Sequence, residues 1–189
     1  MADHEAVVKN GVLMGPRFYG RRKGRPLRVS MKRLLDEDLP QFTFDPARLI
    51  DDQFGRKADR FLEIGFGGGE HLAGLAATMS DCDFIGAEPF INGVASLLRH
   101  IQEKQLGNIR IWPDDVRLIM PSLGVASLAG AFIMFPDPWP KKRHAARRIL
   151  QTTLLDQLAV MIRPGGRLVL ASDDSTAKSW LLQAATVHA

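Results

Sequence analysis

The sequence predicts an α/β fold built on a doubly wound, mostly parallel sheet. Short apolar runs recur along the chain and helical patterns separate them, an alternation typical of strand–helix–strand units. Each run is short and mainly apolar, as expected for strands that are buried on both faces of a sheet. The expected strands cover residues 60–65, 83–88, 108–112, 130–135 and 166–172.

Three helices are expected between these strands. One begins near Glu70, another covers about residues 91–105, and a third runs from about Thr152 to Ile162. Leucines recur on one face of the third helix, and the following Arg-Pro-Gly-Gly is expected to end it. A sheet of this kind binds ligands at the carboxyl ends of its strands, so functional residues are expected there.

The composition indicates a soluble globular protein. Hydrophobic residues make up 46% and charged residues 24% of the 189 positions, proportions typical of one folded domain. The chain lacks an apolar run of about 18 residues that could span a membrane, and its N-terminus lacks the pattern of a signal peptide. Cys82 is the single cysteine, which excludes an internal disulfide and a thiolate metal cluster. We therefore expect a cytoplasmic protein with no membrane contact and no metal.

Positive charge is concentrated near the N-terminus. Residues 1–35 carry a net charge of +7, whereas the rest of the chain carries −3. Residues 1–30 show weak periodicity and many Gly, Pro and Arg residues, so we interpret them as a basic, flexible arm ahead of a domain over residues 31–189. Such a charge distribution suggests a polyanionic partner, although an arm that is simply solvated would also explain it.

The stretch LEIGFGGGEH lies where the first predicted strand turns into the first helix. Gly65 and Gly67 would let a ligand approach the backbone closely, although tight turns also need glycine for steric reasons. The dinucleotide fingerprint G-x-G-x-x-G requires glycine at the position of Glu70, and a carboxylate there would repel a pyrophosphate. A nicotinamide-dependent oxidoreductase is therefore disfavoured. Glu63 adds negative charge, so a cationic ligand without phosphate, such as S-adenosylmethionine, suits this turn better.

Acidic residues follow the next two predicted strands. Glu88 ends the second strand, 21 residues beyond Gly67, where a carboxylate can accept both hydroxyl hydrogens of an adenosine ribose. The alternative is a surface acid at a strand end. Asp115 follows the third strand where an acid can meet the adenine amino group, but the adjacent Asp114 could equally point inward.

The stretch FPDPWPKKRHAARR follows the fourth predicted strand. Its prolines restrict the backbone, so Asp137 is expected to be held at the carboxyl edge of the sheet; alternatively, this residue only caps a proline-rich turn. Trp139 could stack on a base or pack against the sheet. The basic side chains after it suit a phosphate-rich partner, and His144 is interpreted as part of that surface. They are Lys141, Lys142, Arg143, His144, Arg147 and Arg148.

Together with GAEPFINGV, NIRIWPDDV and RPGGRLVLASD, these motifs resemble the bacterial tRNA (guanine-N7-)-methyltransferase family, which has a Rossmann-like class I methyltransferase fold. The arm segment FYGRRKGRPL also resembles the N-terminal segment of that family. The resemblance covers most of residues 17–174. It implies methyl transfer from S-adenosylmethionine to N7 of a guanosine in the tRNA variable loop, at position 46. By matching motifs, it also implies cofactor contacts at Glu63, Glu88, Asp115 and Asp137, with Asp137 catalytic as well. Substrate contacts are implied for Lys141 and Asp173, and RNA contacts for Arg143, His144, Arg147 and Arg148.

The reaction that this resemblance implies requires few catalytic groups. Guanine N7 carries a free lone pair, so no proton must leave before attack, and orientation of the reactants should supply most of the acceleration. A carboxylate such as Asp137 can stabilise the positive charge that develops on the base.

The family pattern continues beyond the fifth strand with a helix, two antiparallel strands and a T-x-[FY]-E segment. This sequence contains the start of the helix, so we expect the final antiparallel strands to be missing and the fifth strand to form an exposed edge. The chain would then be truncated or completed by a partner. Two further alternatives are a methyltransferase with another substrate and an RNA-binding module with little activity. The sequence is compatible with a monomer or a homodimer.

Overall fold

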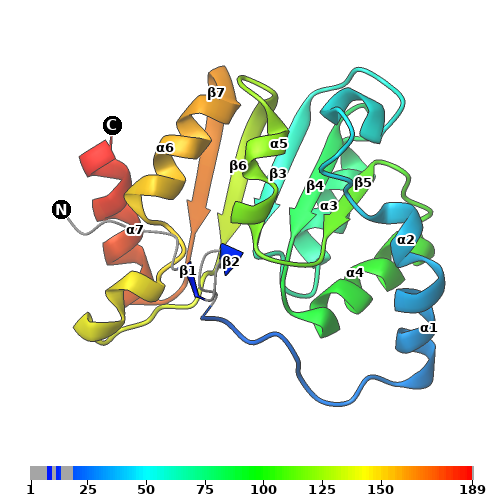
Figure 1. Ribbon diagram of the computed structural model, residues 1–189, viewed down its shortest axis with the longest axis horizontal. Helices are drawn as coiled ribbons and strands as arrows, with labels where there is room; N and C mark the ends of the chain where they lie inside the picture. The colour runs from blue at the N-terminus through cyan, green and yellow to red at the C-terminus, as the bar shows by residue number, and fades with distance from the viewer. Residues whose placement is uncertain (1–7, 10–11, 14–18, 189) are drawn as a thin grey trace.

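One parallel sheet organises the molecule. The structure is a computed structural model that describes residues 8–9, 12–13 and 19–188. Its five-stranded sheet has the order β5-β4-β3-β6-β7, and every neighbouring pair is parallel (Figure 1). This confirms the predicted fold class. The strands are β3 (Arg60–Ile64), β4 (Asp83–Ala87), β5 (Ile109–Trp112), β6 (Leu128–Met134) and β7 (Ile162–Ala171). A separate antiparallel pair is formed by β1 (Val8–Lys9) and β2 (Val12–Leu13).

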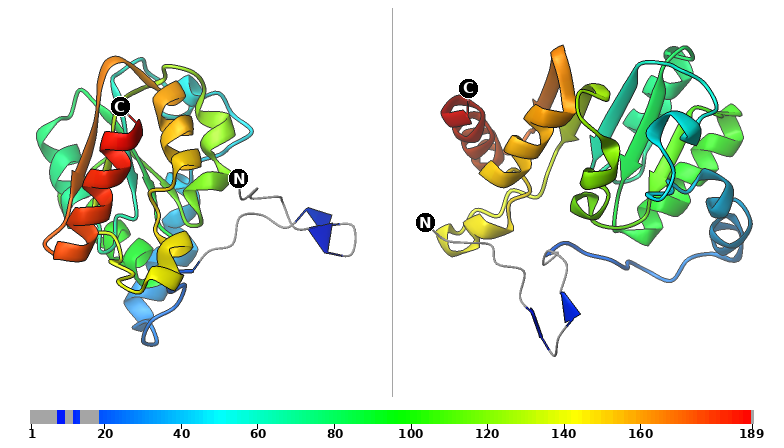
Figure 2. Two further views of the ribbon diagram at one scale, coloured as in Figure 1. Left: turned by 90° about the vertical axis from the view of Figure 1, so that its left-hand side faces the viewer. Right: turned by 45° about the horizontal axis from the view of Figure 1, so that its top comes forward.

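Helices cover both faces of the sheet, as the two further views in Figure 2 show. One face carries α1 (Val29–Glu37), α2 (Leu39–Phe42), α3 (Glu70–Thr78) and α4 (Ile91–Lys104). The other carries α5 (Met120–Leu123) and α6 (Thr152–Met161), with α7 (Ser175–His188) beside them near the β7 edge. Short 3-10 turns are η1 (Ile50–Gln53), η2 (Val116–Leu118) and η3 (Lys142–Arg147).

The core consists of two apolar layers, one on each face of the sheet. Leu62 and Ile85 face α5, α6 and α7, whereas Phe84 packs against Leu97 on the α3–α4 face. All four side chains are almost completely buried. Burying a side chain of this size contributes about 1.5–3 kcal/mol, so these layers hold the sheet and its loops in place.

Strand β7 starts earlier than the sequence predicted. It begins at Ile162 directly after α6, and its register against β6 shifts between Leu128 and Gly130. The helix ends at Met161, close to the expected stop, and the Pro-Gly-Gly segment after it lies within the strand, with Gly165 at a φ of 80°. A bulge absorbs the extra residues, because glycine adopts positive φ without steric cost.

The last helix fixes the loop that follows β6. Trp180 of α7 is 5% exposed, and its indole Nε1 donates a hydrogen bond of 3.0 Å to the carbonyl oxygen of Pro138. At the start of the same loop, the N–H of Phe135 donates to the carbonyl oxygen of Ala171. The loop that carries Asp137 is therefore tied to β7 and α7.

Part of the predicted arm lies along the carboxyl edge of the sheet. The N–H of Gly24 donates to Oδ1 of Asn92 at 2.8 Å, and Nδ2 of Asn92 donates to the carbonyl oxygen of Arg25 at 2.8 Å. The N–H of Ile91 donates to the carbonyl oxygen of Arg22. Residues 20–28 then run to α1 along the lower side of Figure 1, whereas residues 1–7, 10–11 and 14–18 of the predicted arm lie outside the described residues. The predicted boundary at residue 30 stays a prediction.

Among the helices over residues 19–188, none combines the length and the apolar content that crossing a membrane requires.

Two glycine substitutions test how closely α4 approaches the glycine turn. A Cβ on Gly93 would lie 2.0 Å from the carbonyl oxygen of Gly67, whereas a Cβ on Gly74 of α3 would meet nothing within 4 Å. Overpacking against backbone should make Gly93→Ala lower the free energy of unfolding by about 1–3 kcal/mol. The control Gly74→Ala should raise it by about 0.5–1 kcal/mol, because it only removes helix-interior glycine. Urea unfolding measures both, and equal effects would contradict the close approach.

Candidate active site

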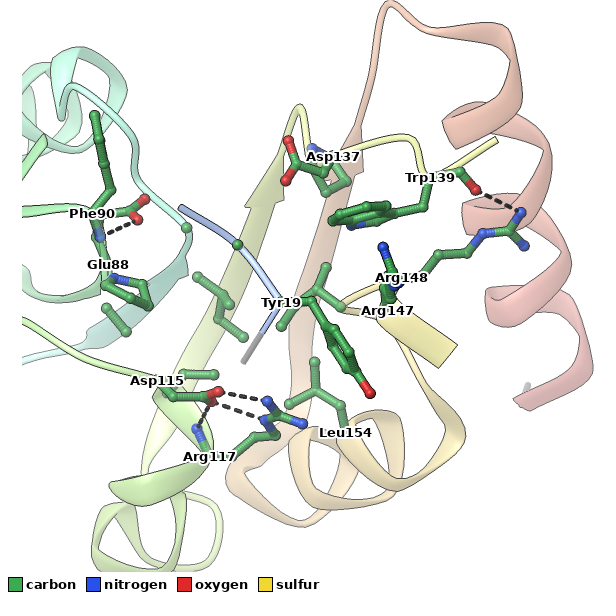
Figure 3. Close-up of a pocket in the computed structure, with 18 of the residues that line it drawn as sticks. Tyr19, Glu88, Phe90, Asp115, Arg117, Asp137, Trp139, Arg147, Arg148 and Leu154 are labelled. Carbon is green, nitrogen blue, oxygen red and sulfur yellow. Dashed lines mark hydrogen bonds and ion pairs between the residues drawn. The ribbon is translucent and has the colours of Figure 1, made fainter. Parts of the chain in front are cut away.

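A cavity of about 610 Å³ opens at the carboxyl ends of the strands. Figure 3 shows its two ends: Glu88 and Asp115 lie on one side, and Trp139, Arg147 and Arg148 lie on the other. We call these the acidic end and the aromatic–basic end. The volume suits a ligand of cofactor size.

The glycine turn and Glu88 build the acidic end together. Gly65 and Gly67 have φ values of 74° and 56°, and a Cβ on either would project into open space. The carboxylate of Glu88 accepts a hydrogen bond of 2.8 Å from the N–H of Gly67 and one of 2.9 Å from the N–H of Phe90. Burial raises the pKa of Glu88 and the charge of Asp137 adds to this, while the two backbone hydrogen bonds oppose it. Ionised carboxylates offer about four acceptor positions, so two remain for a ligand.

Asp115 lines the cavity, whereas Asp114 does not. The carboxylate of Asp115 is 4% exposed and accepts hydrogen bonds from the backbone N–H and the guanidinium of Arg117. The carboxylate of Asp114 instead accepts a hydrogen bond from the N–H of Asp115. The same carboxylate forms an ion pair with the guanidinium of Arg22 in the arm, at an N–O distance of 2.8 Å. Of the two residues that the sequence left open, the structure brings Asp115 to the cavity.

Asp137 stands between the two ends of the cavity. Its side chain is exposed and lies above the cavity in Figure 3, on the loop after β6. Phe135 and Trp139 on either side have φ values of 51° and 39°, a region that residues other than glycine rarely adopt. The prolines and the anchor to Trp180 hold this strained backbone, so the position of the carboxylate is fixed by its surroundings.

The aromatic–basic end contains Tyr19, which the sequence analysis did not select. The guanidinium carbon of Arg147 lies 5.4 Å from the centre of the Tyr19 ring and 5.0 Å from that of Trp139. Arg148 donates to the carbonyl oxygen of Trp139 and lies over the Trp180 ring. Tyr19 is the only tyrosine of the chain and precedes a run of arginines, which was the one available signal.

The predicted site residues divide into two groups. Gly65, Gly67, Glu88, Asp115, Asp137, Arg147 and Arg148 line the cavity. Lys141, Arg143 and Asp173 are exposed outside it, and the His144 ring contacts that of Trp139 edge-on at 5.6 Å. Partial desolvation and the neighbouring positive charges lower the pKa of His144.

Glu63 is also outside the cavity lining. Strand alternation turns its side chain toward α3, where it is 2% exposed and its Oε2 lies 2.8 Å from Nδ1 of His71. Burial raises the pKa of Glu63, and the contact with His71 opposes this. Its predicted role beside a cofactor stays a prediction.

Comparisons with known proteins place the chain in a family. A family model described as "Putative methyltransferase" matches residues 57–189. A tRNA (guanine-N(7)-)-methyltransferase from Rhodospirillum rubrum is 47% identical over 91% of this chain and 71% of its own length. The chain belongs to the tRNA (guanine-N(7)-)-methyltransferase family. A second member, from Paramagnetospirillum magneticum, is 44% identical over 95% of this chain and 78% of its own length.

Solved structures support the fold of this family member. An antibiotic-related methyltransferase superposes with a TM-score of 0.51 at 18% identity, covering 78% of each chain. The antibiotic-resistance methyltransferase Kmr gives the same TM-score at 18% identity, over 77% of this chain and 83% of its own. The class I methyltransferase fold is therefore confirmed.

The buried carboxylate of Glu63 predicts a pH dependence of stability. Because its pKa is raised in the folded state, the folded protein keeps this proton to a higher pH than the unfolded chain does. The contribution of Glu63 to stability should therefore fall as the pH rises from its ordinary pKa of 4.5 to the raised value. Glu63→Gln should flatten this part of the profile, measured by urea unfolding between about pH 4 and pH 8. A variant profile parallel to that of the wild type would contradict the assignment.

Proposed function

We propose that this protein transfers a methyl group from S-adenosylmethionine to N7 of the guanosine at position 46 in the tRNA variable loop. Membership in the tRNA (guanine-N(7)-)-methyltransferase family supports this reaction. The observation that carries it is the cavity itself, because Asp137 stands between an acidic end and an aromatic–basic end. Such a cavity can hold a cationic donor and a base with its phosphates on opposite sides of one carboxylate.

The residues of the acidic end fit the cofactor. The positive-φ glycines leave open space for a ligand against the backbone, and Glu88 keeps acceptor positions for two ribose hydroxyl groups. Asp115 lines the same cavity, and its carboxylate is the proposed acceptor for the adenine amino group. S-adenosylmethionine supplies a methyl group on a positively charged sulfur, which suits an end without a phosphate-binding fingerprint.

Asp137 is the proposed catalytic residue. Methyl transfer forms the N7–carbon bond with the lone pair of the base, and the pair of the breaking carbon–sulfur bond stays on sulfur. Positive charge therefore moves onto the guanine ring, and a fixed carboxylate nearby stabilises it as it develops. No proton has to be removed first, so alignment by Asp137 and its anchored loop supplies the acceleration.

The exposed part of the basic segment is the proposed RNA contact. Lys141, Lys142 and Arg143 point into solvent beside the cavity, whereas Arg147 and Arg148 line it. Cations that bind phosphates release counterions from the RNA, which gives salt-dependent affinity. The predicted substrate contact of Asp173 at the end of β7 is part of the same proposal. We expect the protein to act in the cytoplasm, where this substrate is found.

Labelled S-adenosylmethionine and unmodified tRNA test the reaction. Label should appear as 7-methylguanosine at position 46, and Asp137→Ala should abolish transfer while tRNA still binds, because only the reacting centre is changed. The control Asp36→Ala, an exposed carboxylate on α1, should leave transfer unchanged. Label on another base or atom would overturn the proposed reaction, and near-normal turnover of Asp137→Ala would overturn the catalytic assignment.

The salt dependence of tRNA binding tests the RNA contact. Replacing Lys141, Lys142 and Arg143 together by alanine should reduce the slope of log affinity against log salt by about 2–3, since each lost phosphate contact contributes about 0.7–0.9. S-adenosylhomocysteine affinity, measured by calorimetry, should not change. An unaltered slope would remove these residues from the interface.

A further inference from the structure

Arg147 places a cation against two aromatic rings at one end of the cavity. Its guanidinium carbon is within 5.4 Å of the centre of the Tyr19 ring and within 5.0 Å of that of Trp139. Both distances are inside the range of about 6 Å in which a cation is attracted to a ring face. All three side chains line the cavity and converge in Figure 3.

The two rings come from segments far apart in the sequence. Tyr19 belongs to the arm, which the Arg22–Asp114 ion pair and the Gly24 and Arg25 contacts with Asn92 hold at the sheet edge. Trp139 belongs to the loop that Trp180 anchors. Both anchors are independent of Arg147, so the backbone of both segments stays held if the arginine side chain swings out. The arginine is thus the movable part of this cluster.

The aromatic rings of the aromatic–basic end suit the positive charge of the reaction product. Methylation of N7 turns a neutral guanine into a flat cation, and aromatic faces bind flat cations by stacking and by charge. Tyr19 and Trp139 already hold a flat cation, the guanidinium of Arg147, in the free protein. Asp137 lies on the side of this cluster that faces the acidic end.

We propose that Tyr19 and Trp139 form the stacking site for the target guanine and that Arg147 fills this site until the base enters. The proposal rests on the proposed function and adds a specificity element to it. The base gains positive charge in the transition state, and the faces of the two rings attract that charge. The rings and Asp137 therefore both stabilise the transition state. Arg147, once displaced, is free to reach a phosphate of the same RNA.

Nucleotide binding tests this site without any variant. Calorimetry at about pH 6 with S-adenosylhomocysteine present compares guanosine 5′-monophosphate, 7-methylguanosine 5′-monophosphate and the neutral, same-shaped 7-methyl-7-deazaguanosine 5′-monophosphate. The cationic nucleotide should bind about fivefold tighter than either neutral one, since a cation–ring contact at a partly exposed site is worth about that factor. Equal affinities, equal binding of the two methylated nucleotides, or no saturable binding of the cation would overturn the proposal.

Ring substitutions test the same site in the reaction. Tyr19→Leu and Trp139→Leu should each lower kcat/KM for tRNA about tenfold or more, because loss of one stacking partner costs about this factor. Tyr19→Phe and Trp139→Phe keep a ring and should stay within about threefold of the wild type. S-adenosylhomocysteine affinity should be the same in all four variants.

The stacking site and the methyl-transfer reaction would be contradicted by different results. Normal kcat/KM in the leucine variants would overturn the stacking site and leave methyl transfer intact. Equal losses in leucine and phenylalanine variants would also overturn it, since a ring would then give no advantage. If the wild type does not methylate tRNA at all, the proposed function fails instead.

Discussion

The two backbone hydrogen bonds of Glu88 are the constraint on which the site depends. One comes from the glycine turn after β3 and the other from the residue before α4, so a single carboxylate ties two strand–helix units together. A buried carboxylate is costly unless it is hydrogen-bonded, and here the bonds that satisfy it also fix the turn. Gly93 makes this possible, because only a residue without Cβ lets α4 lie against the carbonyl oxygen of Gly67.

The two ends of the cavity are built in different ways. The acidic end consists of turns that follow β3, β4 and β5, so the sheet places it. The aromatic–basic end is assembled from the arm, the loop after β6 and η3, none of which belongs to the sheet. The Arg22–Asp114 ion pair joins them, because Asp114 also accepts from the N–H of Asp115. The position of the arm is therefore linked to the residue expected to meet the cofactor.

Sequence patterns predicted the sheet well because its strands are short, mostly apolar runs that alternate with helical patterns, and the glycine turn and Glu88 followed from their spacing. Sequence spacing could not show that Glu63 points toward His71 and lies outside the cavity lining, because that depends on which face of β3 it occupies. The start of β7 was missed because Pro164 and Gly165 resemble a loop, whereas the structure uses them in a bulge. The docking of Tyr19 could not be predicted, since it depends on tertiary contacts of Asn92 with a segment that lacks periodicity.

The anchor between α7 and the loop after β6 has a consequence for the order of folding on the ribosome. The carbonyl oxygen of Pro138 finds its donor in Trp180, 42 residues later in the chain. At a synthesis rate of about 5–20 residues per second, Trp180 is added about 2–8 seconds after Pro138, so the loop that carries Asp137 lacks this anchor during that time. The fixed position of Asp137 therefore requires that α7 has been synthesised and has docked on the loop after β6.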